Sequence, residues 1–228
     1  IPPKKKLSFS ENFFYMCFGK VPKKEIVKAF DVSLILYAEH SFNVSTFTAR
    51  TITSSLSDIH GAITGAIASL KGPLHGGANE EVMHMLKKIK KPENAKKWIL
   101  DALENKKLVM GFGHRVYRKG DSRVPTMKKY YYKVAKLLKE KKLPKMSQII
   151  EDVMIEKKNI HPNVDFPTGP TYHMMGFDTD FFTPIFVMSR ITGWSAHIME
   201  QHAANKLIRP LSKYSGEKHR KVMLLNQR

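Results

Sequence analysis

The stretch GAITGAIASLKGPLHGGANEEV, residues 61–82, contains the two features that decide the fold. In its first half, glycine and alanine recur at three- and four-residue spacing, which lets two helices approach closely. In its second half, glycine and proline surround His75 just before Glu80 and Glu81, and carboxylates favour the first turn of a helix. The stretch therefore predicts closely packed helices, with a histidine held in the loop between two of them.

The same helical pattern extends along nearly the whole chain. A core helix pair is predicted over residues 45–70, and single helices are predicted over 10–19, 27–40, 80–89, 95–104, 128–142, 146–157 and 183–205. Pro144 is expected to end one of these helices, and HPNVDFPTG (161–169) is expected to form a loop. Only VMGFGHRVY (109–117) is strand-like. We therefore expect an all-α protein.

The composition is that of a soluble globular protein. The chain has 228 residues, of which 42% are hydrophobic, enough for one large domain or two modest ones. It contains no apolar run long enough to cross a bilayer and no secretory signal sequence at its start. The single Cys17 cannot form an internal disulfide, which indicates a reducing compartment, and its apolar neighbours predict a packed core position.

The net charge of +19 is the strongest signal in the composition. A polyanionic partner such as nucleic acid is one interpretation, and a lysine-rich solvated surface is the other. Lysines occur on amphipathic segments throughout the chain, and no zinc-finger spacing, RNP-like motif or basic zipper is present. The distribution therefore favours the solvated surface, and we expect no nucleic-acid partner.

Four segments interrupt the helical pattern, and each carries histidine, arginine or aspartate: 40–50, 72–79, 111–123 and 161–169. No phosphate-binding loop, HExxH zinc motif or GxSxG nucleophile motif accompanies them, so neither a metal nor an obvious nucleophile is expected. Histidines, arginines and one aspartate suit acid–base chemistry on an anionic substrate, because guanidinium groups bind carboxylates and imidazoles bind carbonyl oxygens.

Five stretches of the chain, taken together and in order, resemble the citrate synthase family: YAEHSFNVSTFTAR, GPLHGGANE, GFGHRVYRKGDSR, NVDFP and NKLIRPLSKYSG. Within that family, EHSFNVSTFTAR, GDSRVP, NVDFPTGPTYHMMGFDT and FTPIFVMSRITGWSAHIMEQ most resemble the 2-methylcitrate synthase branch. The resemblance implies condensation of an acyl-CoA with oxaloacetate, followed by thioester hydrolysis. Propionyl-CoA is the expected substrate. Acetyl-CoA, dual activity, and an inactive or nucleic-acid-binding homologue are the alternatives.

The resemblance also implies catalytic roles for three residues. Asp165 is the base that removes a proton from the acyl carbon, His75 donates to the thioester oxygen, and His114 polarises the ketone of oxaloacetate. A histidine just before a helix experiences the positive end of the helix dipole, which favours a neutral imidazole. His75 can then donate a hydrogen bond without first losing a proton to Asp165.

Four further residues match positions that bind oxaloacetate in the family: His40, Arg123, Arg190 and Arg209. Arg209 is expected to reach into the site of a partner subunit. The composition alone instead favours a buried ion-pair role for Arg190.

Acyl-CoA is implied as a co-substrate, with no tightly bound cofactor. Arg118 matches a position that contacts its phosphate groups, and the backbone of Val109, Gly111 and Gly113 is expected to line the adenine.

The family architecture implies a homodimer of two-domain helical subunits. Residues 1–76 and 176–228 would belong to the large domain, and residues 77–175 would form a small domain that closes on the cofactor. The chain would begin part-way through the large domain, without the family's N-terminal portion. A mitochondrial matrix and a bacterial cytoplasm both fit the charge and the single cysteine.

Overall fold

The computed structural model describes residues 1–117 and 119–228. These residues form ten α-helices and two short 3₁₀ helices: α1 (Phe9–Phe18), α2 (Lys24–Ala38), α3 (Val44–Ser54), α4 (Ile59–Leu70), α5 (Ala78–Ile89), α6 (Pro92–Glu104), α7 (Val124–Leu137), α8 (Lys142–Lys158), α9 (Asp165–Met174), η1 (Thr179–Phe181), α10 (Phe182–Ala203) and η2 (Leu225–Gln227). Within this described part, the extended pairing amounts to a single bridge between Phe112 and Pro162. The prediction of an all-α protein is confirmed.

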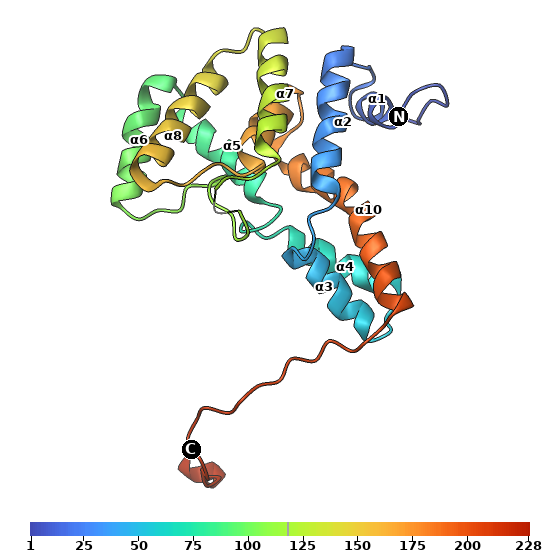
Figure 1. The fold of residues 1–228 in the computed structure, drawn as a ribbon, viewed down its shortest axis with the longest axis vertical. Coiled ribbons are helices and arrows are strands. Elements are labelled where there is room, and N and C mark those ends of the chain that lie inside the picture. Colours follow the sequence, from blue (N-terminus) through green and yellow to red (C-terminus); the bar gives the residue numbers. More distant parts are fainter. Residues whose placement is uncertain (118) are drawn as a thin grey trace.

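The helices form two packed groups (Figure 1). In one group, α9 packs against α5 and α7, while α6 packs against α8. In the other group, α3 and α4 pack against each other and both contact α10. Helix α2 contacts α7 in the first group and α10 in the second, so it connects the two.

The small residues of the opening stretch lie where α4 meets α3. Ala49 of α3 and Ala62 and Ala66 of α4 are fully buried. A Cβ added to Gly65 would lie 2.2 Å from the terminal methyl of Ile52, so the two helices touch where glycine leaves room. The predicted core helix pair is confirmed.

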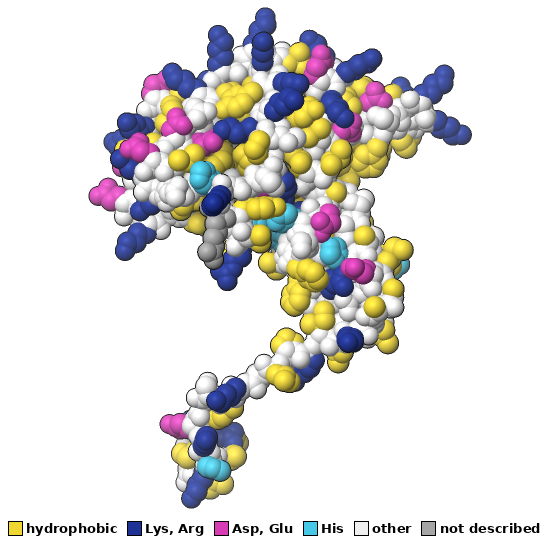
Figure 2. All heavy atoms as spheres, in the orientation of Figure 1, with side chains coloured by type: hydrophobic (Ala, Val, Ile, Leu, Met, Phe, Trp, Pro, Cys, Tyr) yellow, Lys and Arg dark blue, Asp and Glu magenta, His cyan; other side chains and the backbone are white. Residues whose placement is uncertain are grey.

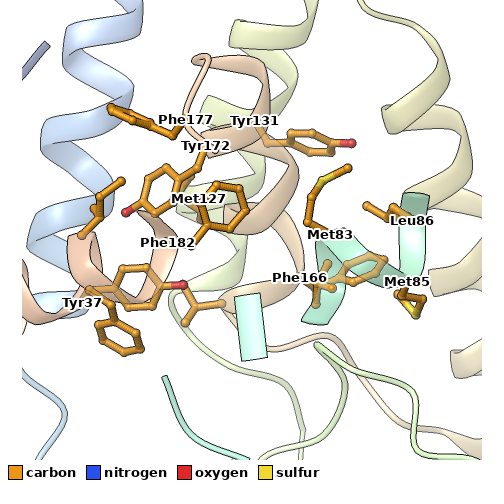
Figure 3. Close-up of a cluster of buried hydrophobic side chains, with 14 of the residues drawn as sticks. Tyr37, Met83, Met85, Leu86, Met127, Tyr131, Phe166, Tyr172, Phe177 and Phe182 are labelled. Atoms are coloured by element: carbon orange, nitrogen blue, oxygen red, sulfur yellow. The ribbon is translucent and has the colours of Figure 1, made fainter. Parts of the chain in front are cut away.

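A cluster of aromatic and methionine side chains lies between α2, α5, α7 and α9 (Figure 3). Tyr37 and Tyr172 are fully buried, and Phe166 is 2% exposed. Burying each such ring stabilises the fold by about 1.5–3 kcal/mol. The Tyr172 hydroxyl donates to the Ser33 hydroxyl at 2.9 Å, so this buried polar group has a partner. The cluster supports the segments that carry the predicted site residues, because Tyr37 and Phe166 belong to both.

Helices α5 and α9 approach each other unusually closely near their first turns. A Cβ on Gly169 of α9 would lie 2.6 Å from the backbone oxygen of Asn79 in α5. Gly111 fills the adjacent position with φ of 82°, and a Cβ there would lie 2.7 Å from Val82. Only glycine meets both demands at Gly111, a left-handed backbone and no space for a side chain.

Two predicted boundaries are wrong, and proline is the reason in both cases. The expected loop over 161–169 contains the start of α9, with Asp165 as its first residue and Pro167 in its first turn. Pro144, expected to end a helix, lies in the first turn of α8. A first-turn proline loses no intrahelical hydrogen bond, because the N–H at that position has no partner within the helix.

Cys17 is exposed, so its predicted core position is wrong. The buried aromatic of α1 is Phe14, which is 1% exposed, and Cys17 lies in the last turn of that helix. Its apolar neighbours therefore do not place it in the core.

Beyond α10, Asn205 and Ile208 still hydrogen-bond to Ser54 of α3, and the chain then leaves the helical body as an extended segment that ends in η2 (Figure 1). Arg209 lies on this segment with an exposed side chain, and its Nη1 donates to the backbone oxygen of Pro210 at 2.7 Å. No helix that the structure describes combines the length and the apolar character that a membrane span requires.

Candidate active site

His75 lies in the short loop between α4 and α5, and its ring is held by the first turn of α3. The backbone N–H of Ser45 donates to Nε2 of His75 at 3.2 Å, and the Ser45 hydroxyl lies 2.8 Å from the same nitrogen. Nε2 is therefore an acceptor, which assigns the ring proton to Nδ1. The Trp194 indole donates to the Ser45 hydroxyl at 3.2 Å and fixes it from α10. His75 thus presents a defined N–H donor at Nδ1.

Asp165 lies at the first position of α9, with a partly buried side chain. The hydroxyl of Tyr37 donates to its Oδ1 at 2.5 Å. Burial raises the pKa of Asp165 to about 6, although the Tyr37 hydrogen bond and the charges of Arg123 and Arg190 oppose the rise. A carboxylate with a pKa near neutrality is suited to act as a general base.

His40 and His114 form an imidazole pair. Their ring centroids lie 5.0 Å apart, nearly perpendicular, and Nε2 of His40 lies 3.0 Å from the hydroxyl of Tyr117. Nδ1 of His114 accepts from the backbone N–H groups of Val116 at 3.1 Å and Tyr117 at 3.3 Å. The proton of His114 is therefore assigned to Nε2, where it is available to a ligand.

Arg123 is fixed by the buried carboxylate of Asp121. The two carboxylate oxygens accept from Nε at 3.0 Å and from Nη2 at 2.8 Å, a bidentate pair. Oδ2 of Asp121 also accepts the backbone N–H of Val164 at 3.0 Å. Burial disfavours the Asp121 anion, but hydrogen bonds and the charge of Arg123 nonetheless lower its pKa. Asp121 therefore ties an arginine to the residue that precedes Asp165.

Arg190, in the middle of α10, is 1% exposed. The salt bridges formed by the described residues do not include it. Its Nε donates to the backbone oxygen of Tyr37, and its Cζ lies 4.6 Å from the ring centroid of Phe186. Burial lowers its pKa to about 10, so it remains charged at neutral pH. The buried ion-pair interpretation of Arg190 is therefore wrong.

All three histidines of the site are neutral at pH 7. Burial, followed by the charge of Arg190, lowers the pKa of His75 to about 4. Burial and the charge of Arg123 lower the pKa of His40 to about 4 and also lower that of His114. The expected neutrality of His75 thus has burial as its main cause. Figure 2 shows histidine side chains at the hollow between the upper body and the α3–α4 region.

The segment predicted to line acyl-CoA borders this cluster. The backbone oxygen of Gly111 accepts from Asn163, and the N–H of Gly113 donates to the oxygen of His161, both at 2.9 Å. Val109 is 5% exposed. A cavity of about 260 Å³ lies beside the segment, with Gly113, His114, Tyr117 and Asp121 in its lining. A larger cavity, of about 530 Å³, lies away from the site between α5, α8 and α9.

The structure brings six of the predicted residues into one region: His40, His75, His114, Arg123, Asp165 and Arg190. Arg209 lies apart on the exposed C-terminal segment. The prediction for Arg118 falls outside the described residues. No group of three histidine, cysteine, aspartate or glutamate side chains within the described ranges has the proximity that a metal ion needs.

Sequence reasoning did not identify Ser45, Tyr37 or Trp194 as part of the site. Ser45 and Trp194 lie in segments that the resemblance covers, but their contacts with His75 depend on three helices meeting. Tyr37 has the pattern of a core residue, since it follows the apolar run of α2. The early signal was its place as the first residue of the matching stretch YAEHSFNVSTFTAR, three residues before His40.

A buried unpaired cation, neutral imidazoles and a carboxylate of raised pKa define the class of site. It suits acid–base chemistry on a ligand that is anionic and carries a carbonyl group. The chain belongs to the citrate synthase family, because the family model described as citrate synthase, C-terminal domain, matches residues 1–211.

Individual relatives agree with this membership. The chain is 56% identical over 220 residues to a 2-methylcitrate synthase of Mycobacterium tuberculosis strain H37Rv, covering 96% of this chain and 56% of that protein. It is 54% identical over 223 residues to a citrate synthase of Mycolicibacterium smegmatis, covering 98% of this chain and 60% of the relative. The chain thus spans less than two thirds of the length of these relatives.

A solved structure gives the same result for the fold. The ternary complex of citrate synthase from Thermoplasma acidophilum with carboxymethyl coenzyme A and oxaloacetate matches with a TM-score of 0.88. The two chains are 38% identical, and the match covers 99% of this chain and 61% of that one.

Proposed function

We propose that this site condenses an acyl-CoA with oxaloacetate and then hydrolyses the thioester. The preferred reaction is propionyl-CoA plus oxaloacetate and water to 2-methylcitrate and CoA. The proposal rests on the environment of Arg190. This buried guanidinium forms no salt bridge with a described residue, and its charge affects the pKa of both Asp165 and His75. A dicarboxylate that pairs with Arg190 is held beside a base and a neutral donor.

Asp165 and His75 activate the acyl-CoA in this mechanism. Asp165 removes a proton from the carbon next to the thioester carbonyl, and Nδ1–H of His75 donates to the oxygen on which negative charge develops. Because His75 is neutral, it stabilises the enolate without first transferring its own proton. Although the sequence suggested that the glycines at 76 and 77 open space for the thioester, both are buried, and a Cβ on Gly76 would lie 2.5 Å from the Leu70 side chain. They instead let the His75 loop pack against the end of α4.

Arg123, His40 and His114 hold oxaloacetate. The Nε2–H of His114 donates to the ketone oxygen, which makes that carbon more electrophilic. Arg123 and Arg190 bind the two carboxylates, with His40 alongside. The bidentate hold of Asp121 keeps Arg123 in one orientation, so the substrate meets a prepared site.

Acyl-CoA binding involves the backbone of Val109, Gly111 and Gly113, together with Arg118. The left-handed conformations of Gly111 and Gly113, with φ of 82° and 76°, support a backbone surface that a flat ring can approach. The wider excess of positive charge attracts the cofactor's phosphate groups, and salt weakens this attraction. Figure 2 shows lysine and arginine side chains spread over much of the visible body, which supports a diffuse field.

The protein acts as a homodimer of two-domain subunits, in which Arg209 of each subunit completes the other's site. The exposure of Arg209 on an extended segment supports this arrangement. Residues 77–175 form the small domain, and residues 1–76 and 176–228 belong to the large one. Packing among α5, α7 and α9 and between α6 and α8 supports this division. Closure of the small domain excludes water until condensation is complete.

Acetyl-CoA is the second candidate substrate, since one relative is named citrate synthase. The two thioesters differ by one methylene, which a pocket discriminates by about 1–3 kcal/mol, or roughly 10- to 200-fold. Comparing kcat/KM for the two thioesters decides between them. A clear preference for acetyl-CoA would overturn the propionyl-CoA assignment. The compartment, mitochondrial matrix or bacterial cytoplasm, stays a prediction.

The mechanism is tested with Asp165→Ala. We expect CoA release from propionyl-CoA and oxaloacetate to fall by about 100-fold or more, because the base is removed. Oxaloacetate binding, measured by calorimetry, is expected to remain largely intact, since Arg123 and Arg190 are unchanged. Undiminished turnover would exclude the mechanism. If the wild-type protein shows no turnover, nucleic-acid retention on filters at physiological salt tests the binding alternative.

A further inference from the structure

Tyr37 contacts more of the site than any role in core packing requires. It is fully buried near the C-terminal end of α2, and its hydroxyl donates to Oδ1 of Asp165 at 2.5 Å. Its backbone oxygen accepts Nε of Arg190, and its ring centroid lies 3.9 Å from that of Phe186. One residue thus fixes groups on α9 and α10, the helices that carry the base and the unpaired guanidinium.

We propose that Tyr37 is a positioning residue for Asp165, whose hydroxyl holds Oδ1 so that Oδ2 is the oxygen that receives the substrate proton. This inference rests on the proposed function, and it assigns the two carboxylate oxygens different tasks. Among the described residues, the hydrogen bonds to the Asp165 side chain comprise the one from Tyr37 to Oδ1, and none reaches Oδ2. A carboxylate held at one oxygen cannot rotate freely, so Oδ2 faces one direction.

The hydroxyl is suited to this task because it stays protonated. Burial, followed by the negative charge of Asp165, raises the pKa of Tyr37 well above its usual value. It therefore donates throughout the working pH range. The ring cannot swing away, because Phe186 covers it and its backbone is bonded to Arg190.

Other groups also act on Asp165, and each has a different effect. The positive charges of Arg123, at the N-terminal cap of α7, and Arg190, in α10, lower its pKa. Asp121, in the segment before α7, raises it, and Tyr172 lies further along α9 itself. On the α5 side, Asn79 packs against Gly169 through its backbone. Among these groups, only Tyr37 combines a direct hydrogen bond with a fixed ring.

The test is Tyr37→Phe, which removes the hydroxyl and keeps the ring. The lost hydrogen bond favoured the Asp165 anion, so its loss raises the pKa of Asp165. The acid limb of the pH profile, which is the fall of kcat/KM at low pH, is expected to shift to higher pH by about one unit. We expect kcat at pH 7 to fall about tenfold, because the base is also less well oriented. The KM for oxaloacetate is expected to stay unchanged, since the bond to Arg190 uses the backbone. An unmoved acid limb with kcat within twofold of wild type would overturn the proposal.

Tyr172→Phe is the matched control. Tyr172 is equally buried and also donates a side-chain hydrogen bond, but its partner is Ser33. Both variants lose one hydroxyl from the same core, so both are expected to lower the melting temperature. Only Tyr37→Phe is expected to move the acid limb. Equal shifts in the two variants would assign the effect to general loosening of the core and would reject positioning.

Two further measurements keep the proposal testable. If Tyr37→Phe does not fold, 3-fluorotyrosine at position 37 keeps the shape and makes a stronger donor, so the acid limb is expected to move down. An acid limb at the same pH as in wild type would refute the proposal.

Carbon-13 NMR titration of the Asp165 carboxyl in wild type and Tyr37→Phe needs no substrate. A higher pKa in the variant supports the hydrogen bond even if the wild-type protein condenses nothing, whereas an equal pKa rejects it.

Discussion

Gly169→Ala tests whether the contact between α5 and α9 sets the geometry of the site. The added Cβ would lie 2.6 Å from the backbone oxygen of Asn79, about 0.8 Å inside the 3.4 Å at which ordinary contact begins. A backbone oxygen within a helix cannot rotate away, so the two helices must separate. His75 precedes α5 and Asp165 begins α9, so the separation changes the distance between the proposed donor and base.

Two energies of opposite sign decide the effect of Gly169→Ala on stability. Overpacking lowers the free energy of unfolding by about 1–3 kcal/mol, whereas the better helix propensity of alanine raises it by up to about 1 kcal/mol. We expect a net loss of about 1 kcal/mol, or roughly 2–4 °C in melting temperature for a chain of this size. Because misplacement on the ångström scale costs about 100-fold in rate, we expect kcat to fall 10- to 100-fold.

The assay combines thermal unfolding, followed by circular dichroism, with steady-state CoA release. Gly61→Ala is the matched control, because its Cβ would meet the Ser57 hydroxyl at 2.8 Å, and the end of this short, partly exposed side chain can rotate away. The control is expected to be as stable as wild type or slightly more so, with kcat unchanged. If Gly169→Ala kept both the melting temperature and kcat within twofold of wild type, the reasoning would be refuted.

Three further predictions concern charge. Asp165 must be ionised to act as a base, and its pKa is about 6, so kcat/KM is expected to fall tenfold per pH unit below pH 6. A kcat/KM that stays constant down to pH 4.5 would contradict its role as the base. His40 and His75 have pKa values of about 4 in the folded protein, below the value in the unfolded chain. The free energy of unfolding, measured by urea titration, is therefore expected to grow as pH rises from 4 to 6.5 and then to level off. Asp121→Asn weakens the bidentate hold on Arg123, and we expect the KM for oxaloacetate to rise about tenfold with a smaller change in kcat; the reverse pattern would mean that Asp121 acts mainly through Val164.

The helical architecture was predictable because it depends on local pattern. The Gly–Ala repeat of α4 and the amphipathic segments of α5 to α8 carry their periodicity in consecutive residues. The start of α9 was not predictable in this way. Its two prolines and one glycine have weak helix propensity, and packing against α5 and α7 stabilises the helix despite them.

The candidate site was predictable only in part. Motif resemblance identified His75, His114 and Asp165, and the structure brings them to one region. It did not identify Ser45 or Tyr37, because their contacts join residues 30 and 128 positions apart. That Arg190 forms no salt bridge with any described residue is likewise a property of the folded chain, since composition alone suggested an ion pair.

The unpaired charge of Arg190 has a consequence for the protein without its ligand. Among the described residues, Arg190 forms no salt bridge, and a buried cation held by a backbone oxygen and an aromatic face lowers the stability of the empty protein. A bound carboxylate removes this penalty, so any anionic ligand that pairs with Arg190 also stabilises the fold. Under the proposed function that ligand is oxaloacetate, and a shortage of it would leave the protein more open to unfolding and proteolysis.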